Sequence, residues 1–332
     1  MCKKNFFVSL GVGVLLILGV FYGFHTKSSL DTNTQFVTVR FGYLPIVWNL
    51  PLYMAVEKGY FTEAKITPDL VQFQSPNQMI DAIMAGQLDF TAPGGPLGIP
   101  AIADYKDPGK MKIYAISGEE SQDAIGVDII VPTNSNINSL KQLKGKKFGI
   151  PAGTIQWRTI AREILAQNGL DMDKDLTVIE LAPNIQVQAI ASGQVDAMLA
   201  LEPIPTVAVS KGVAKILIKA PDKFIADPMW VGAGVVSTKF IKDNSKLADA
   251  VITILNQSLE EVNADFDSSR QYLPKYTSLT ADIVSSVPRI DYKIYKQIDQ
   301  KTKESIKKFL DIFYKYKVVD GALDINNLLY SK

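Results

Sequence analysis

The residues from Gly153 to Gln156 have the types and spacing of an anion-binding turn. Gly153 lets the backbone approach a ligand closely, and Thr154 and Ile155 stand at the start of a predicted helix, where backbone N–H groups lack partners. These donors, with the Thr154 hydroxyl, suit an oxygen of a nitrate, sulfonate or carboxylate group. Gln156 can donate to the same oxyanion. The alternative is an ordinary turn and helix cap that binds nothing.

A second loop, Pro45 to Asn49, is expected to face this turn across a cleft. Trp48 is an aromatic side chain in a polar loop, where it can cover an apolar part of a ligand, and Asn49 can donate to an oxyanion or cap the next helix. Gly94 and Gly95 follow a short predicted strand, and they let the backbone come close to a ligand. The alternatives are a core tryptophan, a capping asparagine and a simple turn.

Glu202 and Trp230 complete the predicted ligand site. A carboxylate at Glu202, opposite an anion-binding turn, suits a zwitterion such as an aminosulfonate. The pair that it forms with Pro203 also fits a contact between lobes or a hinge. Trp230 lies close to a strand that we expect to cross between the lobes, and its alternative is the hydrophobic core.

The scarcity of cysteine and histidine excludes most catalytic chemistry. The 332-residue chain has one of each, Cys2 and His25, and both lie at the extreme N-terminus. A thiol enzyme, a histidine-based triad and a zinc site are therefore excluded from the body that begins near Val37. We expect no catalytic residue, no metal and no cofactor. With 35 basic and 34 acidic side chains, the net charge of +1 provides no field that favours nucleic acid.

Strand-like and helix-like stretches alternate along the chain, which is typical of parallel sheets with right-handed crossovers. The sequence contains an internal repeat: Phe41 corresponds to Phe148 and Asp89 to Asp196, both at an offset of 107 residues (from 41 to 148 and from 89 to 196). The sequence predicts an α/β fold of two lobes related by an internal repeat. From Ser245 onward the pattern is mostly helical.

The order of these stretches sets the predicted domains. Because the C-terminal helical segment should pack back on the first lobe, residues 37–130 and 237–332 form lobe 1. Residues 131–236 form lobe 2 as an insertion. The chain should cross between the lobes near 126–132 and again near 231–237.

An apolar stretch lies at the N-terminus. Lys3 and Lys4 precede 19 uncharged residues, 6–24, which span about 28 Å as a helix. Residues 1–24 are therefore a signal anchor or a cleaved signal peptide, and residues 25–36 a polar tether. We favour the anchor because no small-x-small cleavage site follows, and we expect the body outside the cytoplasmic membrane.

Five segments in order resemble a known family. They are GYLP at 42–45, PLYMAVEKGYF at 51–61, AIMAGQLDF at 82–90, LKGKKFGIPAGT at 143–154 and ASGQVDAMLALEP at 191–203. Together they resemble the type II periplasmic substrate-binding proteins of nitrate, sulfonate and taurine ABC importers, over roughly Val37 to Phe240. The resemblance implies two α/β lobes that close on a small ligand and then dock to a membrane permease with a cytoplasmic ATPase. We expect a monomer.

Two ligand classes and two rival functions stay open at this point. A small anionic or zwitterionic solute is the first expectation, and a heteroaromatic vitamin precursor or an aromatic acid, favoured by Trp48 and Trp230, is the alternative. A sensory ectodomain is a rival of another class. So is an enzyme resembling the pyrimidine synthase of thiamine biosynthesis, which relies on histidine and a cysteine-rich loop that this chain lacks.

Overall fold

The computed structural model describes residues 35–331, and from Phe36 onward these form one compact unit. The predicted membrane segment, residues 6–24, and nearly all of the predicted tether, residues 25–36, lie outside the described residues. Among the residues that are described, no helix is both long and apolar enough to span a membrane.

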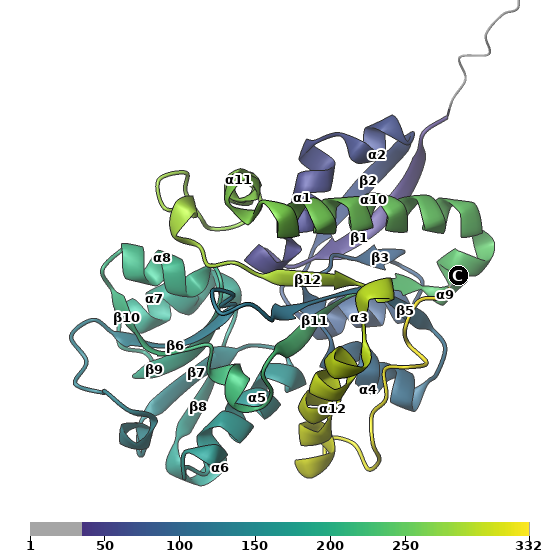
Figure 1. The fold of residues 1–332 in the computed structure, drawn as a ribbon. Helices are drawn as coiled ribbons and strands as arrows, with labels where there is room; N and C mark the ends of the chain where they lie inside the picture. Colours follow the sequence, from purple (N-terminus) through teal and green to yellow (C-terminus); the bar gives the residue numbers. More distant parts are fainter. Residues whose placement is uncertain (1–34, 332) are drawn as a thin grey trace, which may run out of the picture. The chain divides into compact units, whose positions relative to one another are not determined.

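Within residues 35–331 the strands form two separate sheets, one of seven strands and one of five (Figure 1). The seven-stranded sheet has the order β12-β5-β11-β3-β1-β2, with β4 paired to β11, and the five-stranded sheet has the order β10-β6-β9-β7-β8. The strands of the first sheet are β1 (Val37–Tyr43), β2 (Ile66–Gln72), β3 (Phe90–Thr91), β4 (Gly95–Pro96), β5 (Met111–Glu119), β11 (Met229–Ser237) and β12 (Asp291–Ile294). Those of the second are β6 (Val127–Pro132), β7 (Lys147–Pro151), β8 (Thr177–Leu181), β9 (Ala197–Leu201) and β10 (Ala214–Lys219). The predicted α/β fold is thus confirmed as two sheets.

Helices connect and cover these strands (Figure 1). They include α1 (Leu50–Glu57), α2 (Tyr60–Glu63), α3 (Pro76–Met84), α4 (Gly98–Lys106), α5 (Ile155–Gln167), α7 (Gln186–Ala191), α8 (Ile204–Ser210), α10 (Ser245–Ala264) and α12 (Gln300–Lys315), with the short 3-10 helices η1 (Val47–Asn49) and η4 (Pro221–Phe224). The remaining α-helices are α6 (Met172–Asp175), α9 (Thr238–Asp243) and α11 (Phe266–Ser269). The longest of them, α10, buries one face against α1 and β12.

The two sheets share one pattern of pairing around β1 and β7. The parallel pairs, each followed by its counterpart 107 residues later, are Phe41–Phe90 and Phe148–Ala197, and Gly42–Thr91 and Gly149–Met198. A carboxylate fixes the start of each strand in the same way. Asp89 Oδ2 accepts from Arg40 N at 2.9 Å, and Asp196 Oδ2 accepts from Lys147 N at 2.8 Å. Phe41 and Phe148 thus have matching pairings in their two sheets, and the internal repeat itself stays a prediction.

The chain passes twice between the sheets, once from β5 to β6 and once from β10 to β11. We name these two segments, residues 120–126 and 220–228, the hinge segments. Lys223 joins them by donating to Ser121 O at 3.2 Å, and Ser121 N in turn donates to Asp291 Oδ2 at 2.6 Å. The second passage comes earlier than the sequence suggested, because residues 229–237 pair with β5 in the seven-stranded sheet. The lobe boundaries at 130/131 and 236/237 stay a prediction.

The paired carboxylates at the strand starts allow a matched test of the fold. Asp89 is buried and also accepts from the Arg40 guanidinium at 2.6 and 3.0 Å, whereas Asp196 is half-buried and bonds only the Lys147 backbone. We expect Asp89→Ala to lower the free energy of unfolding by about 2–3 kcal/mol and Asp196→Ala by about 1 kcal/mol. Urea titration of both variants measures this. Equal losses would contradict the proposed difference.

Candidate functional site

The loop that carries Asn49 is tied to a second loop of the same sheet. Asn49 Nδ2 donates to Leu44 O at 2.7 Å, and its Oδ1 accepts from Gly94 N at 2.8 Å. Asn49 therefore positions Gly94, and its side chain does not cap α1 as the sequence suggested. Gly95 lies in β4, where its backbone pairs with Ala233.

Trp48 is enclosed by two glycines and has an unused donor. A Cβ on Gly94 would lie 2.5 Å from Trp48 Cβ, and one on Gly126 would lie 2.0 Å from Cζ2 of the indole. Only glycine allows this close approach. Although Trp48 is buried, its Nε1 has no hydrogen-bond partner among the described residues. A buried donor of this kind is costly unless a ligand or water accepts from it.

The predicted anion-binding turn forms the N-terminus of α5. Gly153 has a φ of +65°, its N–H donates to Glu180 Oε2 at 3.3 Å, and its carbonyl accepts from Ser75 Oγ of the other lobe at 3.1 Å. Thr154 caps the helix. In the described part of the chain, the N–H groups of Thr154, Ile155 and Gln156 donate to no acceptor. They are therefore free to bind an oxyanion.

Gln156 is placed differently from the prediction. Its side chain is fully buried, its Oε1 accepts from Gly98 N at 2.7 Å, and its Nε2 donates to Val231 O at 3.0 Å. Both partners belong to elements of the seven-stranded sheet or to α4 beside it. The side-chain amide of Gln156 is thus occupied by the opposite lobe.

The backbone of Glu202 makes two hydrogen bonds, whereas one oxygen of its carboxyl group makes none with the described residues. Its N–H donates to Gly126 O at 2.9 Å, and its carbonyl accepts from Val47 N at 3.3 Å. The side chain is buried, and Oε2 has no partner among residues 35–331. Burial raises the pKa of the Glu202 carboxyl to about 8, although Thr206 opposes this by donating to it. A ligand that donates a hydrogen bond would satisfy the free oxygen.

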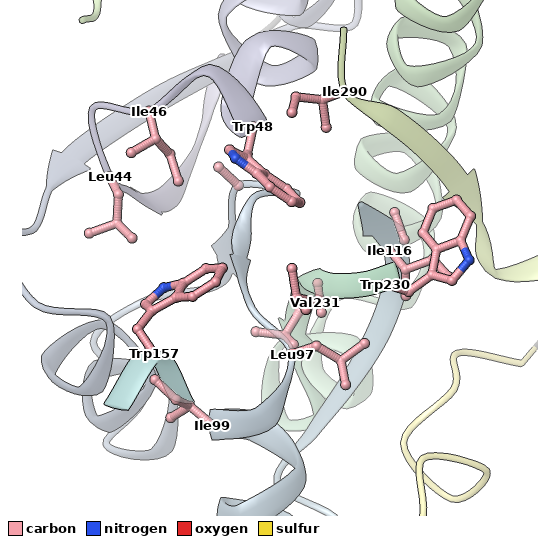
Figure 2. Close-up of a cluster of buried hydrophobic side chains, with 14 of the residues drawn as sticks. Leu44, Ile46, Trp48, Leu97, Ile99, Ile116, Trp157, Trp230, Val231 and Ile290 are labelled. Atoms are coloured by element: carbon pink, nitrogen blue, oxygen red, sulfur yellow. The ribbon is translucent and has the colours of Figure 1, made fainter. Parts of the chain in front are cut away.

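Figure 2 shows that the three tryptophans lie in two different places. The indoles of Trp48 and Trp157 extend toward the same region from η1 and α5, whereas Trp230 lies apart beside Ile116. Trp230 is fully buried, and Lys293 Nζ lies 4.9 Å from the centroid of its ring. Sequence reasoning missed Trp157, although its position one residue after Gln156, in the first turn of a helix that starts at the predicted turn, could have revealed it.

Sequence reasoning also missed three buried carboxyl groups in or beside the hinge segments: Glu119, Asp128 and Asp222. Glu119 Oε1 accepts from Gly126 N at 2.6 Å and Asp128 Oδ1 from Ala220 N at 3.3 Å. Glu119 Oε2 and both oxygens of Asp222 have no partner among the described residues. Burial raises the pKa of Glu119 well above its usual range, with Asp222 adding to the rise. Burial also raises the pKa of Asp222 and of Asp128 to about 7.

The described interior contains acidic groups but no buried lysine or arginine. An anion bound between the lobes would therefore rely on backbone N–H groups and helix dipoles. Trp48, Gln156 and Glu202 are each at most 2% exposed, so a ligand can reach them only if the lobes move apart. A surface groove of about 690 Å³ beside Tyr105 and Tyr314 contains none of the predicted site residues.

The sequence of the chain matches a known protein family and a described relative. Residues 49–267 match the family model described as NMT1/THI5 like. A protein of Bacillus subtilis described as an aliphatic sulfonates-binding protein is 25% identical over 328 residues, covering 96% of this chain and 94% of that protein.

Solved structures share the fold. The periplasmic aliphatic sulphonate binding protein SsuA from Escherichia coli superimposes with a TM-score of 0.69 at 18% identity, covering 89% of this chain and 97% of that one. The periplasmic nitrate-binding protein NrtA from Synechocystis PCC 6803 gives a TM-score of 0.65 at 16% identity, covering 86% and 82%. The desulfurization enzyme DSZB, at 13% identity, covers 89% of this chain and 97% of its own with a TM-score of 0.63. The fold therefore serves binding proteins and an enzyme.

The raised pKa of Asp222 gives a stability test with a defined sign. A buried acid whose pKa rises from 3.8 to about 7 on folding binds more protons in the folded state, so stability falls as pH rises from about 4 to about 7. Asp222→Asn removes this titration. We expect the variant to gain at least about 1 kcal/mol over the wild type between pH 5 and pH 8, measured by urea titration at each pH.

Asp123→Asn is the matched control, because Asp123 is exposed in the first hinge segment. The groups that face Asp222 and its neighbours are Glu119, Asp128, Lys219 and Lys223. A constant difference across this pH range would show that Asp222 is already ionised at pH 5.

Proposed function

We propose that this chain, which belongs to the NMT1/THI5-like family, is the extracytoplasmic solute-binding component of an ABC importer. The observation that carries the proposal is the family match over residues 49–267, together with a two-sheet fold shared with periplasmic binding proteins. A permease and its ATPase are the implied partners. In keeping with its binding-protein relatives, the protein is proposed to bind its solute without covalent chemistry, and the described residues supply neither a thiol nor an imidazole.

The mechanism that we infer is capture by closure of the lobes. A ligand that touches both lobes binds the closed state more tightly than the open state, so binding shifts the equilibrium toward closure. The two hinge segments are the covalent links about which the lobes would turn. We further infer that the lobes arose by internal duplication, that residues 6–24 anchor the protein, and that it works as a monomer.

The ligand class that we propose is a small sulfonate, and within it a zwitterion. The free N–H groups of Thr154 and Ile155 suit the sulfonate oxygens, in keeping with the sulfonate-binding relatives. The unpartnered oxygen of Glu202 suits an ammonium group at the other end. A flat heteroaromatic amine is the second candidate, and the two indoles of Trp48 and Trp157 in one region favour it (Figure 2).

The anion site can be tested at the turn. Gly153→Pro with Thr154→Ala removes the Gly153 N–H and forbids its φ of +65°. We expect at least a tenfold weaker affinity for ethanesulfonate by calorimetry, because the α5 N–H groups lose their geometry. Gly193→Pro is the control, since Gly193 also has a positive φ in lobe 2 but has no atom within 4 Å of its would-be Cβ. Unchanged ethanesulfonate affinity in the double variant would exclude this turn.

The role of Glu202 separates zwitterions from simple sulfonates. Glu202→Gln keeps the shape of the side chain and removes the carboxyl group, whose pKa of about 8 a bound ammonium group would lower. We expect taurine binding to weaken at least tenfold while ethanesulfonate binding stays within about threefold of the wild type. Tryptophan fluorescence titrations with both compounds measure this. An equal loss for both compounds would show that Glu202 acts on the fold and not on an ammonium group.

A further inference from the structure

Helix α5 makes polar contacts with the opposite lobe at two levels. The first level is Gln156, in the first turn of the helix, and the second is Glu163, seven residues later. Seven residues make about two helical turns, so both side chains lie on the same face. That face packs against α4 and α12 of the other lobe.

The contacts of Gln156 would not survive separation of the lobes. Its two hydrogen bonds reach Gly98, at the N-terminus of α4, and Val231, in β11. The Oε1 atom takes an N–H group that α4 cannot satisfy internally, as an anion would at a helix N-terminus. Both bonds are buried, and neither involves a ligand.

Glu163 makes the second contact with the end of α12. Its Oε2 accepts from Lys315 Nζ at 2.6 Å and from Tyr316 Oη at 2.8 Å, and its side chain is 8% exposed. Burial by itself would raise the pKa of Glu163, but the donors Lys315, Gln167 and Tyr316 hold it below its usual value. Arg162 adds a cation–π contact, with its guanidinium 5.4 Å from the Tyr316 ring.

We propose that Gln156 is a closure residue, which holds the two lobes together through Gly98 and Val231, with Glu163 as a second contact. The side-chain amide of Gln156 thereby sets the affinity for the solute without touching the solute. The effect on affinity rests on the proposed solute-binding function. The effect on lobe closure concerns the solute-free protein and does not depend on that function.

The thermodynamic consequence follows from the fraction of closed molecules. When only the closed state binds tightly, the apparent dissociation constant is the intrinsic one divided by the closed fraction. Contacts between the lobes raise that fraction before any solute arrives. Loss of the Gln156 contacts should therefore weaken the affinity for every solute by the same factor. Loss of a direct contact to the solute should instead weaken the affinity for some solutes more than for others.

The test measures closure in the solute-free, full-length protein. Spin labels are attached after Glu63→Cys on α2 and Gln194→Cys after α7, both exposed, in a Cys2→Ser background. Double electron–electron resonance then reports the distance between the lobes. We expect Gln156→Ala to shift the closed-to-open ratio at least tenfold toward longer distances, and Glu163→Ala to shift it in the same direction by less. Gln156→Glu, which keeps an acceptor for Gly98 and loses the donor to Val231, should be intermediate and serves if Gln156→Ala does not fold.

The matched control is Gln186→Ala. Gln186 is equally buried, but its Nε2 donates to Leu181 O within lobe 2, at 3.0 Å. An unchanged distance distribution in Gln156→Ala and Gln156→Glu, or an equal shift in Gln186→Ala, would overturn the proposal. Calorimetry with taurine and ethanesulfonate forms a second arm, in which both affinities should fall about tenfold in Gln156→Ala. If neither compound binds the wild type, the proposed solute class fails while the distance measurement still decides the role of Gln156.

Discussion

Two short segments are the covalent links between the two sheets, and every other link between them is non-covalent. The hinge segments are tied to each other by Lys223 and Ser121 and to β12 by Asp291. Away from them, polar contacts join the two halves through four residues, which are Ser75, Gln156, Glu163 and Glu202. Because these contacts join the two sheets, a rotation about the hinge segments would have to break them, and it would also separate apolar side chains of one core that runs from Trp48 to Trp157. The position of the hinge thus determines which residues can change partners.

The electrostatics of the interior limit how such a protein can hold an anion. Within residues 35–331 no buried lysine or arginine offers positive charge to an anion near the hinge, and burial raises the pKa of the acids that lie there. The N-terminus of α5 is the exception, since its free N–H groups carry partial positive charge. A solute with charges of both signs fits this arrangement better than a simple anion does. The proposed zwitterionic ligand therefore depends as much on the carboxyl at Glu202 as on the turn at Gly153.

More of the fold than of the candidate site could be predicted from the sequence. Alternating strands and helices, with the 107-residue offset, led to the α/β fold and two sheets, because backbone pairing follows local patterns. The pairing of residues 229–237 could not be read locally, since it depends on β5, more than a hundred residues earlier. Thr154 lies at the helix start as expected. Asn49 and Gln156 bond protein atoms instead of standing free, because which partner an amide finds is set by tertiary packing. The ligand contacts of all ten predicted residues stay predictions.

The topology also fixes the order in which the two sheets can be completed. The five-stranded sheet lies within residues 127–219, so its strands are all present once that continuous stretch has been made. By contrast, β5 at residues 111–119 must wait for β11 and for β12, which ends at residue 294. The lobe that begins first along the chain is therefore finished last, and its long-range pairing makes it the slower part to fold. Until then β5 is an open strand edge, and a nascent chain must be kept from pairing it with another molecule.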